Sequence, residues 1–182
     1  MRYHDRPSFN ARMASIKQDV LSIACGHAVA AWGDTLESFF DKFQRSGVMV
    51  DFESNVSYYT DGCLGTELVA KVYDRFTNGR VYHKRTSPGV DIQRLPEFWV
   101  GWALGHYQEV TGRTFDDILS RIPLRSWLEY YPWLHTMGER EVFDYIEEAY
   151  QAGCGHLDRL SCARQGKRLH LIERTTHRRP IP

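Results

Sequence analysis

Apolar side chains recur along most of this chain at steps of three and four residues, the spacing that places them on one face of an α-helix. The first such run extends from Phe9 to Ala31. It lies between Ser8, a residue type that begins helices, and Gly33, a residue type that ends them. The same spacing predicts further helices over about 34–47, 64–76, 96–111 and 137–150, with two short ones over 114–123 and 124–130.

Residues 48–62 fit two different structures. Val48, Val50 and Phe52 alternate with other positions as in a strand, which would allow a small β-hairpin near 48–60. A short helix followed by a loop fits the same residues equally well. The pattern therefore leaves both open.

Aromatic residues are concentrated in residues 98–135, which hold four of the five tryptophans. The predicted helix 96–111 is apolar around most of its circumference, which is typical of a buried helix. Its phasing makes Trp99 and Trp102 mainly core residues. The end of the aromatic segment, Tyr130–Trp133, stays a candidate for an exposed protein-binding anchor, because Trp and Tyr are enriched among the residues that carry binding energy. The candidates there are Tyr130, Tyr131 and Trp133.

These patterns predict an all-α or mostly α protein. We expect a compact bundle of about six helices around a central Trp-rich helix, formed by residues 1–152. Periodicity fades after Gly153, so residues 153–182 are predicted to be a basic, partly disordered C-terminal extension.

Charge divides the chain in the same place. The net charge of the 182 residues is zero, but seven Lys/Arg against two acidic residues after position 150 leave five positive charges there. Such a segment is suited to the phosphates of a nucleic acid or to an acidic protein surface, and a merely solvated tail is the alternative. The basic candidates for partner contact are Arg164, Lys167, Arg168, Arg174, Arg178 and Arg179.

No run approaches the roughly 18 apolar residues of a membrane span, and the start lacks the apolar run of a signal peptide. We therefore expect a cytoplasmic protein without a membrane partner. Four cysteines lie far apart, so disulfides are not implied. The sequence leaves the oligomeric state open.

Candidate chemistry is sparse. His106, Tyr107 and Glu109 could form an acid–base cluster, but no nucleophile stands at a telling spacing, and a core histidine is the alternative. The Cys and His residues of the extension do not follow the compact spacings of structural zinc sites. These residues are Cys154, His156, Cys162, His170 and His177. Phosphate loops, dinucleotide fingerprints and hydrolase motifs are absent from the sequence. We expect a protein that is not an enzyme and carries no cofactor or metal.

Several short sequence motifs, called phrases below, resemble those of a family of small accessory proteins from bacterial chromosomes and mobile elements. They are the helix end Glu37–Gly47, the Gly-x-Glu-Leu helix at Gly65–Leu68, the Trp-x-Gly-Trp-x-Leu-x-x-Tyr-Gln helix at Trp99–Gln108, and the Tyr-Pro-x-x-His turn at Tyr131–His135. The resemblance covers roughly residues 20–150, and the phrase at Trp99–Gln108 is its most specific part.

The resemblance implies neutralisation of a larger effector by binding. Members of the family lie beside toxin genes, and the family is expected to include an anti-CRISPR inhibitor of a type II RNA-guided nuclease. We therefore expect a non-enzymatic anti-CRISPR protein that binds such a nuclease, with the basic extension touching guide RNA or target DNA. The alternative is an antitoxin-like protein that neutralises a toxin enzyme. An enzyme using His106 and Glu109 is the third hypothesis.

Overall fold

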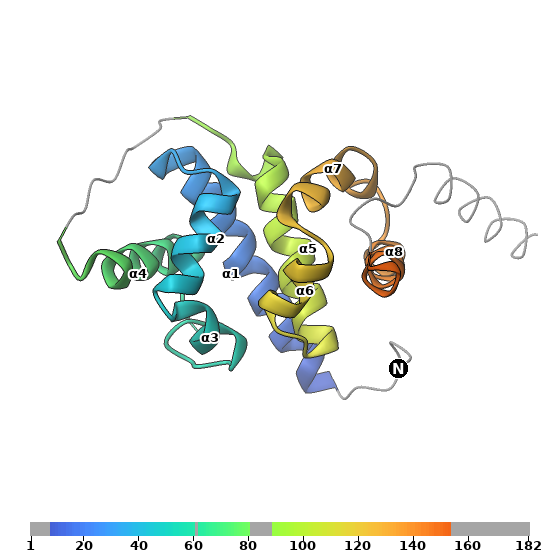
Figure 1. Ribbon diagram of the computed structural model, residues 1–182, viewed down its shortest axis with the longest axis horizontal. Coiled ribbons are helices and arrows are strands. Elements are labelled where there is room, and N and C mark those ends of the chain that lie inside the picture. The colour runs from blue at the N-terminus through green and yellow to red at the C-terminus, as the bar shows by residue number, and fades with distance from the viewer. Residues whose placement is uncertain (1–7, 61, 81–88, 154–182) are drawn as a thin grey trace, which may run out of the picture.

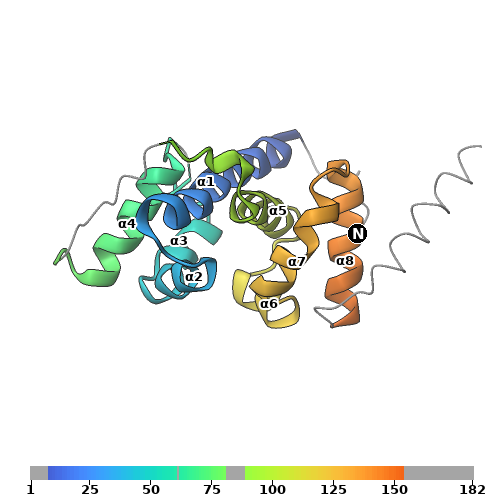
Figure 2. The same ribbon diagram turned by 90° about the horizontal axis from the view of Figure 1, so that it is seen from above.

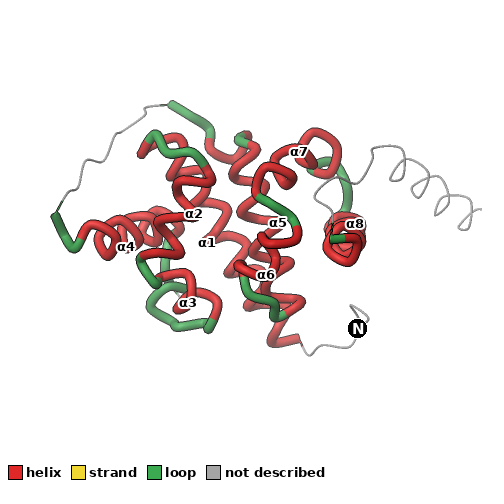
Figure 3. Tube along the Cα trace, in the orientation of Figure 1, coloured by secondary structure: helices red, strands yellow, loops and turns green. Residues whose placement is uncertain are grey.

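The structure is a computed structural model that describes residues 8–60, 62–80 and 89–153, with side chains from residue 16 onward. Within these residues every regular element is helical (Figures 1 and 3), so the prediction of a mostly α protein is confirmed. The elements are α1 (Ser8–Trp32), α2 (Leu36–Arg45), α3 (Val48–Glu53), α4 (Gly65–Thr77), the 3₁₀ turn η2 (Ile92–Arg94), α5 (Pro96–Thr111), α6 (Phe115–Arg121), α7 (Leu124–Leu134) and α8 (Glu139–Ala152).

Helices α1 and α5 lie along one another and form the middle of the molecule (Figures 1 and 2). The shorter helices α2, α3, α6 and α7 lie on one side of this pair. Helix α4 lies at one end of the molecule and α8 at the other. Most of the fold is thus arranged around one long helix–helix contact.

Glycines allow this contact to be unusually close. A Cβ atom placed on Gly101 of α5 would lie 2.5 Å from the carbonyl oxygen of Leu21 and 2.8 Å from the Cα of Ser22, both on α1. One turn later, a Cβ on Gly105 would lie 3.0 Å from the carbonyl oxygen of Lys17. Because any side chain at Gly101 would overlap the backbone of α1, the two helices depend on the missing Cβ atoms.

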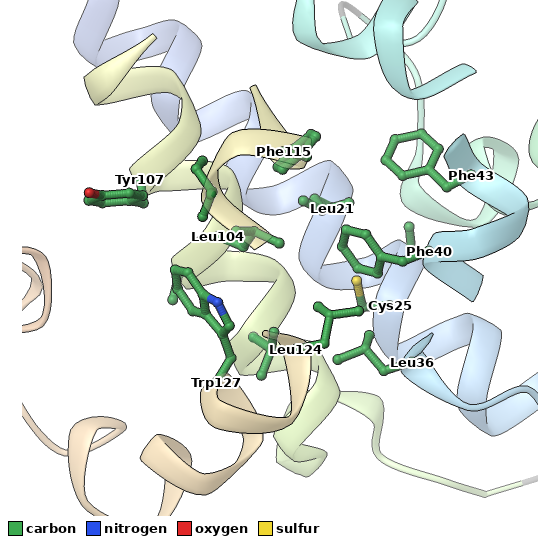
Figure 4. Packing of buried hydrophobic residues seen from close by; sticks show 14 of the residues in the cluster. Leu21, Cys25, Leu36, Phe40, Phe43, Leu104, Tyr107, Phe115, Leu124 and Trp127 are labelled. Atoms are coloured by element: carbon green, nitrogen blue, oxygen red, sulfur yellow. The ribbon is translucent and has the colours of Figure 1, made fainter. Parts of the chain in front are cut away.

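The core between the helices is rich in phenylalanine. Phe43 of α2 stacks on Phe39 at 5.8 Å and meets Phe52 of α3 edge-on, also at 5.8 Å between ring centroids. Figure 4 shows Leu21 of α1, Leu104 of α5 and Phe40 of α2 converging on the same interior region. Edge-to-face and offset ring pairs of this kind add to the free energy gained from burying their area.

The hairpin considered near residues 48–60 is wrong. Residues 48–53 form helix α3, and the side chains show why. A strand would place Val48, Val50 and Phe52 on one face, whereas Val48 and Phe52 are 0% exposed and Val50 is 62% exposed. Met49, at 3% exposed, completes the helical face that packs into the core. The buried positions therefore follow helical spacing. A helix buries Met49 together with Val48 and Phe52, whereas a strand would turn Met49 to the opposite face.

A lysine is enclosed in this core. Lys17 of α1 is 0% exposed, and its Nζ donates to the Glu53 carbonyl oxygen at 3.0 Å and to Gln108 Oε1 at 2.9 Å. Its charge is balanced by Glu109, whose Oε2 lies 2.8 Å away. All three ammonium protons thus have acceptors, which a buried cation requires. The lysine joins α1, α3 and α5 at one point.

The two glycines of α5 provide a graded test of the close contact. Alanine should improve helix propensity equally at both positions, by about 1 kcal/mol, so the difference between the variants isolates the steric clash. We expect Gly101→Ala to lower the free energy of unfolding by about 2–3 kcal/mol more than Gly105→Ala, measured by urea denaturation. Equal stabilities of the two variants would contradict the contact.

Lys17 provides a second test. Lys17→Met should destabilise the protein by about 3–5 kcal/mol, because it removes the ammonium that pairs with the partly buried Glu109 carboxylate. Adding Glu109→Gln to that variant should restore part of the loss, because the neutral amide costs less to bury. The measurement is a double-mutant cycle by chemical denaturation, and simple additivity of the two changes would refute the pairing.

Candidate binding site

A groove of about 390 Å³ lies between η2, the start of α5, the end of α7 and the turn into α8. Its size is within the usual range for small-molecule sites, and its walls are mainly aromatic. Figure 1 shows α7 beside the upper end of α5, with α8 beyond α7. The lining residues are Gln93, Phe98, Trp99, Trp102, Tyr131, His135, Met137 and Glu139.

The aromatic rings of the groove support one another. Tyr131 meets Trp99 edge-on at 5.9 Å and stacks on His135 at 4.5 Å, with 25° between the two planes. Trp102 lies parallel to His106 at 6.2 Å. Trp99, Trp102, Tyr131 and His135 therefore each contact another aromatic ring, which restricts their orientations.

Helical spacing brings these rings to one place. Phe98, Trp99 and Trp102 stand at i, i+1 and i+4 on α5, so they share one side of that helix. Tyr131 and His135 are four residues apart at the end of α7. The Nδ1–H of His135 donates to the Tyr131 carbonyl oxygen at 2.6 Å, which closes the helix and fixes the ring.

Helix α7 is longer than the sequence pattern predicted. It continues past residue 130 to Leu134 and includes Pro132. Proline removes the hydrogen bond to the carbonyl four residues earlier, and here α7 continues for only two residues beyond it. Because α7 continues to Leu134, Tyr131 lies on a helix and its side chain lines the groove.

The position of Glu139 depends on where α8 begins. The sequence pattern predicted a helix from about residue 137, but α8 starts at Glu139 with Gly138 as its N-cap residue. The Gly138 N–H donates to Glu141 Oε2 at 3.0 Å, so Glu141 performs the capping role. Glu139 is thereby free to lie beside the groove, with 47% of its side chain exposed.

The suspected acid–base cluster on α5 is not assembled. His106 is 5% exposed, and its Nδ1 lies 3.2 Å from Glu139 Oε1, whereas Glu109 pairs with Lys17. The Tyr107 hydroxyl donates to Glu147 Oε2 at 2.6 Å. Burial lowers the pKa of His106, and the neighbouring Glu139 carboxylate acts against this shift. The three side chains thus serve three different helix contacts.

A charged network fastens α8 beside the groove. Arg113 binds both oxygens of Glu147, at 2.6 and 3.1 Å, in the fork geometry that suits a guanidinium and a carboxylate. Its Cζ also lies 3.8 Å from the centre of the Tyr150 ring. Burial raises the pKa of Glu147, but hydrogen bonds from Arg113, Tyr107 and Gln151 outweigh it and bring the pKa to about 2. This network holds α8, and with it Glu139, in place.

The predicted anchor residues have different surroundings. Tyr130 is 3% exposed and packs edge-on against Tyr145 at 5.3 Å, so the expectation of an exposed anchor is wrong for this side chain. Trp133 is half-buried and meets Tyr145 at 4.5 Å. Tyr131 alone lines the groove. Neighbouring residues on a helix point in different directions, which is why one of the three reaches the groove and the others pack against α8.

Other predicted site residues lie outside the described part of the chain. These are Arg164, Lys167, Arg168, Arg174, Arg178 and Arg179, together with Cys154, His156, Cys162, His170 and His177. Of the eight residues that line the groove, sequence reasoning named only Tyr131 as a site residue. Trp99 and Trp102 were predicted to be core residues, and the other five were not named as candidates. Phe98 could have been found from its helical spacing to Trp102, but Gln93, Met137 and Glu139 come from turns and helix ends, for which periodicity gives no signal.

The described ranges contain neither a metal-binding group of side chains nor a membrane-spanning helix. No group of three or more His, Cys, Asp or Glu side chains there is placed to hold a metal ion. None of the helices α1–α8 is long and apolar enough to cross a membrane.

The Arg113–Glu147 pair predicts a pH-dependent stability. Since the folded pKa of Glu147 is about 2 and the ordinary value is 4.5, its stabilisation is complete above pH 4.5 and is lost as the pH falls through 2. We expect Glu147→Gln to cost about 1–2 kcal/mol at neutral pH after allowance for solvent screening, and almost nothing near pH 2. Urea titrations across this range measure the difference, with the exposed Asp144→Asn of the same helix as control. A pH-independent cost would contradict the assignment.

Comparison with known proteins gives no relative for this chain: no protein-family model, no curated protein and no solved structure matches it. The family resemblance carried by Trp99–Gln108 and Tyr131–His135 therefore stays a prediction.

Proposed function

We propose that this protein is a non-enzymatic inhibitor that binds a bacterial type II RNA-guided nuclease through the aromatic groove. The observation that carries the proposal is that two of the four phrases of the family resemblance meet there. Trp99 and Trp102 come from the phrase at Trp99–Gln108, and Tyr131 and His135 come from the phrase at Tyr131–His135. Gly101 and Gln108 of the former phrase have structural roles, at the α1 contact and at Lys17.

The groove has the character of a protein-binding surface. Aromatic side chains with one face accessible dominate the binding energy of protein interfaces, particularly when the scaffold fixes them in advance. Trp102 and Tyr131 are half-buried, so each is held by the core and still open to a partner. A toxin enzyme is the alternative target, and the same groove would serve it.

A cleavage assay tests the proposal. Purified nuclease, guide RNA and target DNA are mixed with increasing amounts of the full-length protein, and cut DNA is quantified. Inhibition should be complete near an equimolar ratio, because a binding inhibitor acts by occupancy. Undiminished cutting at a large excess of protein would contradict the proposal, and relief of a neighbouring toxin's activity would then favour the antitoxin alternative.

Two tyrosine variants locate the contact. Tyr131→Ala should raise the concentration needed for half-maximal inhibition by about tenfold or more, corresponding to the loss of an aromatic anchor. Tyr58→Ala is the matched control, because Tyr58 is 64% exposed but lies in the turns after α3, outside the groove. Equal inhibition by the wild type and Tyr131→Ala would show that the groove is not the contact surface.

A further inference from the structure

We propose that the groove receives the guanidinium group of an arginine side chain on the partner protein. This inference rests on the proposed function, because it states which chemical group of the target the inhibitor takes. It is carried by the charge and the ring arrangement of the eight lining residues.

The groove is electrostatically suited to a cation. Among the described residues, its lining contains no lysine or arginine, and Glu139 is the one carboxylate. Aromatic rings present a negative face, and a cation within about 6 Å of a ring centre is attracted to it. The rings of Trp102 and Tyr131 therefore attract a cation, as the Glu139 carboxylate does. An anionic group would meet repulsion from both.

Hydrogen-bond acceptors complete the site. Glu139 contacts His106 and also accepts from Gln18 Nε2 at 3.3 Å, which positions its carboxylate while nearly half of the side chain stays exposed. His135 Nδ1 forms its hydrogen bond with the Tyr131 carbonyl oxygen, so the other ring nitrogen, Nε2, takes no part in that bond. The side-chain carbonyl of Gln93, another lining residue, is a further acceptor. A guanidinium supplies five N–H donors to such groups.

Arginine suits this groove better than lysine. Its guanidinium is planar, more weakly hydrated than an ammonium, and stacks on aromatic rings while its edge donates to a carboxylate. The Tyr131–His135 stack and Trp102 offer ring surfaces, and Glu139 offers the carboxylate. A lysine would use the charge but not the planar face.

The proposed target makes an arginine a reasonable ligand. A nuclease that holds guide RNA and target DNA must line its channel with cationic side chains that contact phosphates. An inhibitor that takes one of these arginines removes a phosphate contact and occupies the channel entrance. Binding of an arginine in the groove would thus explain how the protein inhibits the nuclease.

A pair of peptides tests the inference with the full-length protein. One is a fluorescein-labelled peptide of glycine, serine and arginine, and the other has citrulline in place of every arginine. Citrulline keeps the planar shape but carries no charge and fewer donors. Fluorescence anisotropy should show the arginine peptide binding about tenfold or more tightly than the citrulline peptide.

Variants assign the binding to the groove. Glu139→Gln should lower affinity for the arginine peptide about tenfold, whereas Asp144→Asn, which removes a charge from an exposed position of the same helix, should not. Tyr131→Phe keeps the ring and should retain binding, and Tyr131→Ala should lose it. The conservative variants show that any loss is not caused by misfolding.

Three results would overturn the inference. These are equal binding of the two peptides, arginine-selective binding that survives both Glu139→Gln and Tyr131→Ala, and a self-association abolished by Tyr131→Ala, which would make a second copy of the chain the occupant. The proposed function can fail separately. Arginine-selective binding without nuclease inhibition refutes the nuclease as target, and inhibition without arginine selectivity refutes only the ligand.

Discussion

The close approach of α1 and α5 is the constraint on which the rest of the structure depends. Gly101 and Gly105 let the backbone of α5 rest directly on that of α1, and Gly65 does the same for α4, where a Cβ would lie 2.4 Å from the Val20 carbonyl oxygen. Such contacts leave little room for sliding, because backbone atoms cannot move aside as side chains do. The two helices therefore act as a rigid base for all the shorter ones.

Lys17 and the α8 network extend this rigidity in two directions. Lys17 joins α1 to α3 and α5 from inside the core, and its burial demands all of its acceptors. Arg113 and Glu147 attach α8 at the periphery, where the pair is partly exposed. The first fixes the fold, and the second fixes the helix that carries Glu139. The proposed function depends on both interactions, because a groove made from α5, α7 and the start of α8 keeps its shape only if these helices keep their relative positions.

The groove also explains how one stretch of sequence can serve the core and a surface at once. On α5, Trp99 is 8% exposed and Trp102 is half-buried. On α7, Tyr130 is 3% exposed and the next residue, Tyr131, is half-buried. Aromatic residues at adjacent helical positions point in different directions, so some anchor the scaffold and others form the walls of the groove. The buried His106 lies parallel to Trp102 and contacts Glu139, so it supports two of the residues that line the groove.

The sequence by itself determined the helices with strong periodicity. The predicted helix 96–111 is the observed α5, and the first helix ends before Gly33 as expected, because apolar spacing and glycine stops are local properties. Tertiary structure decided residues 48–53, where burial of Met49 selected a helix over a strand. It also decided the start of α8, the length of α7 and the groove itself. Met137, Glu139 and Gln93 reach that groove from turns and helix ends, and only the packing of α8 and η2 against α5 brings them together.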